Sequence, residues 1–414
     1  MKKISFIGLG KLGLPCAEVI KDKGFEVYGY DINKISSNKI ILVNSIKEAV
    51  VDKDLVFIAV PTQHSFAYDG RHPTSHLPPK DFDYEIVKNC ITEANKFMNK
   101  NQILILISTI LPGTFKSELS SLVKNTNFVY NPYLIAMGSV AWDMVNPEML
   151  ILGCNENHKN IIPKMKSFYS SIMENNPRIV TGTWEECECI KIFYNTFISA
   201  KISLVNMIQD VAMKLGNINV DVVTKALSES DMRIMGPQYM TAGMGDGGAC
   251  HPRDNIALRF LSKKLEMGYD LFSAIMDARE IQAKNLADYL CNLAKKKNMQ
   301  IYIHGKSYKP GVEYLDGSYS ILVDEFLKKN KKEAIFIDPL TEKSIPKSIK
   351  GIILLAHSSS TTYKYIKNDT KFFDNYYTNF EKGSVVVDPW RKFPITKELE
   401  VIHYGNTRVF NSVD

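Results

Sequence analysis

A glycine-rich turn near the start of the chain constrains the fold more than any other feature. Residues 3–7 read as a short buried strand, and Gly8, Gly10 and Gly13 follow with GxGxxG spacing. Gly8 permits a tight turn, Gly10 lets the backbone approach a pyrophosphate, and Gly13 lets the next helix pack closely on a sheet. The pattern predicts the first strand, turn and helix of a doubly wound α/β domain that binds a dinucleotide. The alternative is a plain glycine-rich turn.

An acidic residue at the end of the next expected strand indicates which dinucleotide binds. A helix over about 14–23 would point its N-terminal amides at the phosphates, so Lys11 and Leu12 join the glycines as expected contacts. A second strand over 25–30 leads to Asp31. A carboxylate in that place binds both ribose hydroxyls and repels a 2′-phosphate, so we expect NAD rather than NADP.

Composition narrows the class of protein. A chain of 414 residues with 45% hydrophobic and 23% charged residues predicts a globular protein of two or three domains. No apolar run reaches the length of a membrane span, and the net charge of +6 shows no dense basic stripe, so we expect neither membrane nor nucleic acid as a partner. Seven scattered cysteines favour reduced thiols in a cytoplasm, and the CxC pair Cys187 and Cys189 lacks partners for a metal site.

The order of the expected elements divides the chain into three parts. Strand signals alternate with helical ones through the first third, over residues 54–60, 102–108, 128–130 and 178–180. Apolar residues then recur at helical spacing over 185–215, which is typical of a helix that bridges domains or pairs with its own copy. Parallel-type strands return over residues 300–304, 333–337, 351–356 and 384–387. This second α/β unit echoes the first only at the level of the fold, and residues 63–83 read as a long loop.

A second glycine-rich segment presents a thiol. Cys250 follows Gly247 and precedes His251 and Arg253, with a helix expected from about Pro252. A cysteine attacks as a thiolate, and both basic neighbours and a helix N-terminus lower a thiol pKa. Cys250 is therefore a candidate nucleophile, although a small buried core residue is the alternative, and His251 fits packing or hydrogen bonding better than base catalysis.

Lys191 and Asn195 lie four residues apart on one face of the long expected helix. A developing alkoxide needs a cation or dipoles close by, and this pair would supply them. The simpler alternative for Lys191 is a solvated helix charge. Two further polar residues, Asp254 and Thr109, have simple structural explanations. Asp254 could pair with Arg253, and Thr109 could be an ordinary hydroxyl at a strand end.

These residues resemble the UDP-glucose/GDP-mannose dehydrogenase family over nearly the whole chain. The resemblance adds further motifs to the Gly8 turn, Lys191, Asn195 and the Cys250 segment. They are Val60-Pro61-Thr62, Ser108-Thr109, Pro112-Gly113-Thr114, Asn131-Pro132, Lys201-Ile202, Asp231-x-Arg233-Ile234, Ser307-Tyr308-Lys309 and Asp388-Pro389-Trp390-Arg391.

The resemblance implies a four-electron oxidation of a sugar C6 alcohol to an acid with two NAD. Cys250 would add to the intermediate aldehyde and give a thioester after the second hydride transfer. Lys191 would stabilise the oxyanion with help from Asn195. Asp254 would position a water or act as a base, and Thr109 would hold that water near the nicotinamide.

The resemblance also implies the binding contacts. NAD would contact Val60, Pro61, Thr62 and Thr109 as well as the glycine turn. The nucleotide sugar, most simply a UDP-sugar, would contact Tyr133, Leu134, Ile135, Lys191, Asn195, Arg233, Gly247 and Lys309. In such enzymes the residue at Arg233 reaches the neighbouring subunit's site, which implies a homodimer. Arg233 as a surface ion-pair partner is the alternative.

Four positions depart from the family pattern. The two glutamates expected after Asn131-Pro132 are Tyr133 and Met137, the expected phosphate-binding lysine is Thr241, and an expected arginine is Asp316. A neutral tyrosine cannot replace a carboxylate base at pH 7 without a large pKa shift. Either another group performs thioester hydrolysis, or the substrate differs, or the reaction stops early.

The expected architecture is two doubly wound α/β domains joined by a long helix. We expect an NAD domain over 1–183, a helical dimerisation segment over 184–298, and a nucleotide-sugar domain over 299–414, with the site in the cleft between the α/β domains. Two other functions stay open. A two-electron hydroxyacid dehydrogenase would not need Cys250, and a degenerate sugar-nucleotide binder would need no nucleophile.

Overall fold

The structure is a computed structural model in which the chain forms two compact units, residues 1–203 and 204–414. The boundary falls inside one long helix. Most of the expected 63–83 loop lies outside the described residues. The structure describes residues 2–62, 77–78, 80–135, 139–155, 160–232, 234–236, 242–244, 250–308, 310, 313, 315–357 and 378–406.

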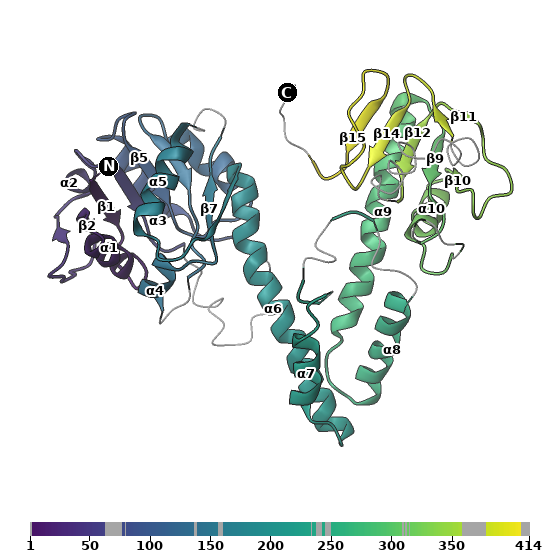
Figure 1. Cartoon of the computed structure of the whole chain (residues 1–414), viewed down its shortest axis with the longest axis horizontal. Helices are drawn as coiled ribbons and strands as arrows, with labels where there is room; N and C mark the ends of the chain where they lie inside the picture. The colour runs from purple at the N-terminus through teal and green to yellow at the C-terminus, as the bar shows by residue number, and fades with distance from the viewer. Residues whose placement is uncertain are drawn as a thin grey trace. The chain divides into compact units, whose positions relative to one another are not determined.

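The first unit is built on an eight-stranded sheet with the order β3-β2-β1-β4-β5-β6-β7-β8 (Figure 1). The strands are β1 Lys3–Ile7, β2 Glu26–Tyr30, β3 Ile41–Leu42, β4 Leu55–Ile58, β5 Ile103–Leu106, β6 Asn127–Tyr130, β7 Met149–Gly153 and β8 Arg178–Gly182. The six strands from β3 to β6 are parallel, while β7 pairs antiparallel with β6 and parallel with β8. All strands predicted in this region are confirmed, and β3 and β7 are additional.

Helices cover both faces of this sheet, as doubly wound folds require. One face carries α1 Gly13–Asp22, α4 Val140–Val145 and α5 Ile162–Ile172, and the other carries α2 Ile46–Val50, α3 Glu85–Asn95 and the short helical turns η2 Phe115–Leu119 and η3 Ser120–Leu122. Stacked aromatic rings anchor each side: Phe6 on Phe57 with centroids 4.7 Å apart, and Phe115 on Phe128 at 3.9 Å. The central strands are buried on both faces, which explains their continuous apolar sequences.

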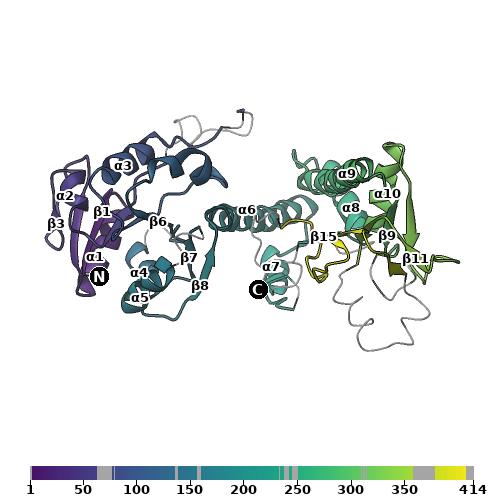
Figure 2. The same ribbon diagram turned by 90° about the horizontal axis from the view of Figure 1, so that it is seen from above.

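The second unit contains most of the helical segment and a second sheet. The long helix α6, Trp184–Leu215, begins in the first unit and is followed by α7 Val220–Ser228, α8 Cys250–Lys264 and α9 Leu271–Lys297. The sheet has the order β10-β9-β12-β14-β15, all parallel, and α9 packs beside α10 on one of its faces (Figures 1 and 2). The remaining bounds are β9 Ile301–His304, α10 Tyr319–Lys329, β10 Ala334–Ile337, β11 Ser348–Ile349, β12 Ile352–Leu355, β13 Asn379–Phe380, β14 Val385–Asp388 and β15 Glu400–His403. The parallel character and the four expected strands are confirmed.

The likeness between the two sheets goes further than the sequence predicted. In each, a glycine with positive φ follows the first strand, and its N–H donates to the carbonyl at the end of the neighbouring strand: Gly8 (φ +97°) to Tyr30 at 2.8 Å, and Gly305 (φ +102°) to Ile337 at 2.9 Å. The next amide donates to an aspartate, Asp31 at 2.7 Å or Asp338 at 2.8 Å. The expectation of a likeness only at fold level was therefore wrong, because the two turns share their hydrogen bonds.

Two properties of the described residues concern the surroundings of the protein. Among the helices of the described ranges, none is both long enough and apolar enough to span a bilayer. Within the same ranges, no three His, Cys, Asp or Glu side chains gather in a group that could hold a metal ion.

Candidate functional site

The glycine turn after β1 is tight for reasons that the structure makes specific. A Cβ on Gly8 would lie 2.7 Å from the Ala59 carbonyl oxygen, and one on Gly13 would lie 2.0 Å from the Gly8 carbonyl oxygen. Neither position admits a side chain, so both glycines serve the packing of β1, β4 and α1. A Cβ on Gly10 would meet nothing within 4 Å. Protein packing leaves Gly10 unexplained, whereas close approach of a pyrophosphate explains it.

This difference predicts the behaviour of two matched variants. Gly10→Ala should fold with a thermal stability within about 0.5 kcal/mol of the parent, since its Cβ has room and its φ is not positive. NAD affinity should nevertheless fall by about tenfold or more, which is about 1.4 kcal/mol. Gly13→Ala should lose stability itself. Thermal unfolding and NAD titration check both variants, and unchanged NAD binding by Gly10→Ala would refute the assignment of the turn.

Asp31 lies at the end of β2 with its carboxylate beside the turn. Its Oδ2 accepts from the Leu9 amide at 2.7 Å, and its Oδ1 accepts from the Asn33 amide at 2.8 Å. The side chain is only partly buried, so lone pairs stay available for ribose hydroxyls. The corresponding Asp338 is 3% exposed and accepts from Lys306, Ser307 and Leu340 amides, which closes the second turn to a ribose. The first turn therefore fits a dinucleotide better than the second.

A cavity of about 480 Å³ opens at the carboxyl ends of the first-unit strands. Successive strands are added to one side of β1 up to β3 and to its other side from β4 onward. Ligands of open α/β sheets bind at such a switch point. Most of the residues predicted to hold cofactor and substrate in this unit line the cavity together. The lining is Gly10, Lys11, Leu12, Ala59, Val60, Pro61, Thr62, Ile107, Ser108, Thr109, Tyr133, Ile135 and Lys191.

Lys191 brings a cation to this cavity from the second turn of α6. Its Nζ donates to the Tyr133 carbonyl oxygen at 2.7 Å, which fixes the direction of the side chain. Burial lowers the pKa of Lys191. The ammonium is part-buried, uses one of its N–H groups in this hydrogen bond and faces a cavity. Such a group is suited to stabilising a developing oxyanion. Asn195 lies one turn further along α6, where its side chain is exposed.

Tyr133 is not placed as a free group in the cavity. Its hydroxyl lies 3.0 Å from the hydroxyl of Tyr169 on α5, which donates in turn to Asn131 Oδ1. Asn131 Nδ2 donates to the Ile151 carbonyl at 2.7 Å. Because a carbonyl can only accept, this bond fixes the donor and the acceptor in each of the other hydrogen bonds of the network. Tyr133 must therefore donate to Tyr169. Burial raises the pKa of Tyr133 well above its ordinary value, so this phenol is no base at neutral pH.

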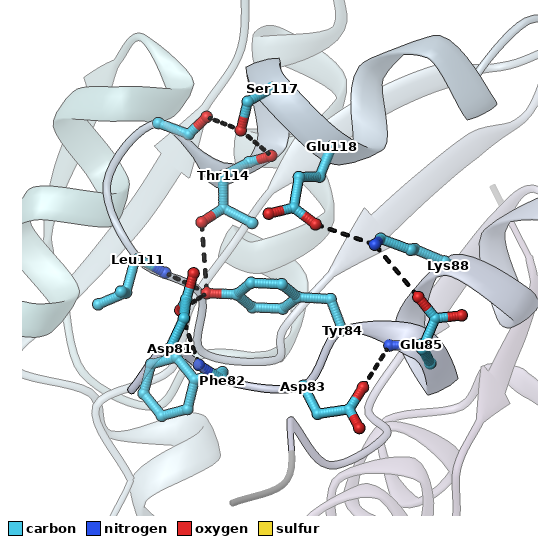
Figure 3. Close-up of polar contacts among 11 residues, drawn as sticks. Asp81, Phe82, Asp83, Tyr84, Glu85, Lys88, Leu111, Thr114, Ser117 and Glu118 are labelled. Carbon is cyan, nitrogen blue, oxygen red and sulfur yellow. Dashed lines mark hydrogen bonds and ion pairs between the residues drawn. The ribbon is translucent and has the colours of Figure 1, made fainter. Parts of the chain in front are cut away.

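The loop after β5, residues 109–115, is fastened at several points. Figure 3 shows the phenol of Tyr84 reaching this loop, where its oxygen accepts from the Leu111 amide and the Thr114 hydroxyl, both at 3.3 Å. The same phenol donates to Asp81 at 2.7 Å, and burial together with this hydrogen bond raises the pKa of Tyr84 to about 12. Thr62 Oγ1 donates to the Thr109 carbonyl at 2.8 Å, so the loop also holds the segment that follows β4.

The loop is also held from α6 by a buried carboxylate that the sequence did not single out. Glu188 accepts from the Gly113 and Phe115 amides. Its sequence signal was its place three residues before Lys191, on the same helix face. Tyr169 carried no such signal.

The other candidate residues are only partly described. Arg233, Gly247 and Lys309 lie outside the described residues, as do Met137 and Thr241. Leu134 packs against the core on the α3 side of the first sheet. Cys250 is the first residue of α8 and Asp254 lies in its second turn, and only their backbone is described. The helix expected from Pro252 thus begins two residues earlier, which places Cys250 at the helix N-terminus.

Comparisons with known proteins agree with this arrangement. Residues 33–173 match the NAD binding domain of the UDP-glucose/GDP-mannose dehydrogenase family, and residues 185–280 match its central domain. Together the two matches cover more than half of the chain.

Individual relatives extend over most of the chain. A UDP-glucose 6-dehydrogenase of Rickettsia prowazekii (strain Madrid E) is 23% identical over 375 residues, covering 86% of this chain and 85% of that protein. A UDP-N-acetyl-D-mannosamine dehydrogenase of Methanococcus maripaludis is 27% identical over 368 residues, covering 82% and 80%. The crystal structure of a GDP-mannose dehydrogenase from Pseudomonas aeruginosa, at 19% identity, shares the fold with a TM-score of 0.77 over 96% of this chain and 99% of that one. The chain therefore belongs to the UDP-glucose/GDP-mannose dehydrogenase family, and it is an NAD-dependent nucleotide-sugar dehydrogenase.

Proposed function

We propose that this protein oxidises the C6 alcohol of a nucleotide sugar, UDP-glucose or a close analogue, to the uronic acid. One observation carries the proposal: the Lys191 ammonium opens onto the same cavity as the dinucleotide turn at Gly10. A hydride acceptor and an oxyanion-stabilising cation would then meet the same carbon. The UDP-sugar dehydrogenases among the relatives support the substrate class.

The proposed reaction runs through two hydride transfers. The alcohol first loses a hydride to NAD and a proton to solvent, which gives the aldehyde. The Cys250 thiolate then adds to the aldehyde carbon, and the thiohemiacetal loses a second hydride to a second NAD to become a thioester. Water cleaves the thioester, restores the thiol and releases the acid, with Thr109 and Asp254 orienting that water and Lys191 and Asn195 binding the oxyanion.

The surroundings of Tyr133 bear on the last step. The phenol commits its proton to Tyr169 and its pKa is raised by burial, so it supplies no carboxylate-like base. Loss of a general base slows a step by about 10²–10⁴-fold. We therefore propose that thioester hydrolysis is the slow step in this protein.

Counting the NADH formed per nucleotide sugar consumed tests the function. UDP-glucose, UDP-N-acetyl-D-mannosamine and GDP-mannose serve as substrates, because relatives or structural neighbours carry these names. Two NADH per sugar supports the proposal. One NADH would indicate a two-electron dehydrogenase, and none with any of the three sugars would indicate a binder.

The proposal also assigns a role to each of the three parts of the chain. We propose that residues 1–183 bind NAD, 184–298 form the dimerisation segment, and 299–414 bind the nucleotide of the substrate through Lys309. Gly247, Leu134 and Ile135 are proposed substrate contacts, and Arg233 is proposed to reach the neighbouring subunit.

The proposal of a dimer is supported by the surface of α6. Phe193 and Phe197 are 54% and 53% exposed, and Ile198, Leu204 and Val205 on the same helix are exposed as well. An exposed apolar stripe of this kind usually meets a partner, and a second α6 has the matching apolar surface. We expect a dimer by sedimentation at micromolar concentration and a monomer for Phe197→Glu. A monomer at all concentrations of the unmodified protein would contradict the dimer and the cross-subunit role of Arg233.

A further inference from the structure

We propose that Glu188 is a positioning residue that fixes where Thr109 and Lys191 lie relative to each other across the cavity. These two side chains line the same cavity but come from different elements, since Thr109 follows β5 and Lys191 lies on α6. Glu188 lies on α6 and binds the loop that begins at Thr109. The inference rests on the proposed function, because it concerns the geometry of that same site.

The contacts of Glu188 make it a cap supplied from another helix. Its Oε2 accepts from the Gly113 amide at 2.5 Å and its Oε1 accepts from the Phe115 amide at 2.9 Å. These amides lie at the start of the η2 turn, where N–H groups lack partners within the helical turn. Gly113 has a φ of +88°, so the loop turns sharply where the carboxylate holds it.

Stability alone does not account for a carboxylate in this place. Glu188 is 0% exposed, and burial raises its pKa. Burying a carboxylate is costly because the charged form loses its hydration, and the hydrogen bonds that it accepts offset part of this cost. What an apolar residue cannot do is accept two backbone protons and thereby fix the loop against α6.

Because Glu188 and Lys191 lie on the same helix, the contacts that hold Glu188 also restrict the position of the Lys191 ammonium. Lys191 lies three residues further on, on the same face of α6. At the other end of the fastened loop, the Thr109 carbonyl accepts from Thr62 Oγ1. The two hydrogen bonds that the Glu188 carboxylate accepts therefore tie the helix that carries Lys191 to the loop that carries Thr109. A shift of either element changes the distance between the two groups that face the reacting carbon.

The variant Glu188→Gln tests the proposal with little change in shape. A glutamine has one acceptor oxygen, and its NH₂ group would face one of the two amides, so one bond is lost. We expect kcat with NAD and nucleotide sugar to fall by about 10- to 100-fold, because displacements of about 1 Å cost that much. The Kd for NAD should stay within about threefold, since Gly10 and Asp31 are untouched. The control is Glu185→Gln, a half-exposed glutamate one turn earlier on α6. Its only described contact with η2 is a 3.8 Å ion pair with the largely exposed Lys116, which is worth little, so both values should stay unchanged.

A second variant and a second measurement separate the possible outcomes. Glu188→Met fills the same volume without an acceptor, and we expect it to fold and to lose kcat as Glu188→Gln does. Hydrogen exchange should rise in residues 109–115 and 189–195 of both variants but not in Glu185→Gln. Exchange needs no turnover, so it tests the coupling even if the parent oxidises no nucleotide sugar, which would refute only the proposed function. Unchanged kcat, unchanged exchange, or failure of both variants to fold would overturn the positioning role.

Discussion

Cys250→Ala should abolish acid formation, with a fall in the rate of about 10³-fold or more, since no thioester can form. The residue is the first of α8, and the amides at a helix N-terminus favour a thiolate. The cavity beside Gly10 and Lys191 belongs to the first unit and is built without this residue, so NAD should still bind. Slow exchange between alcohol and aldehyde should survive, because the first hydride transfer needs no thiol.

The measurement for this variant is product analysis together with NAD titration. Cys291→Ala, on α9, is the matched control and should form acid at the parent rate. Acid formed by Cys250→Ala at more than about a tenth of the parent rate would be incompatible with a fall of that size and would remove Cys250 from the mechanism.

Lys191→Met should lower kcat by about 10²–10³-fold, the usual cost of removing one donor to an oxyanion. The Met side chain keeps the apolar stem but loses the ammonium that donates to the Tyr133 carbonyl. Since the glycine turn and Asp31 lie on other elements, the Kd for NAD should change little. The control is Lys164→Met, at an exposed lysine on α5, which should leave kcat and the Kd for NAD unchanged.

The pH profile gives an independent check on Lys191. Burial lowers its pKa, so the Lys191 ammonium loses its proton at a lower pH than an ordinary lysine does. The kcat of the parent should therefore fall as the pH rises through this lowered pKa. The residual activity of Lys191→Met should lack that alkaline fall. An identical alkaline limb in both proteins would assign the titration to another group.

The sequence predicted the parts of the site that depend on local spacing. The Gly8 turn, Asp31 and Lys191 could be singled out because each candidate is identified by its position within one strand, turn or helix. In the structure Gly10 and Lys191 line one cavity, and Asp31 accepts from the Leu9 amide in the turn. The strand β7, by contrast, was missed. It is a five-residue run that pairs antiparallel with β6, which alternation of parallel strands and helices does not predict.

The role of Tyr133 could not be predicted for a similar reason. The sequence indicated that a neutral group replaces a carboxylate, but its partner Tyr169 is 36 residues away on α5. That the Tyr133 backbone carbonyl receives Lys191 is likewise a tertiary contact. In the sequence Glu188 resembles any charge on a helix, because its burial and its two amide partners depend on tertiary contacts.

Rapid mixing of the protein with NAD and its nucleotide sugar, followed by intact-mass measurement, tests the central claim most directly. Because Tyr133 offers no base, hydrolysis should lag the hydride transfers by about 10²–10⁴-fold. We predict a burst of about two NADH per active site, then a slow phase during which an acyl adduct sits on Cys250, as in any covalent mechanism with slow deacylation. Linear NADH production with no adduct on Cys250 would contradict the account.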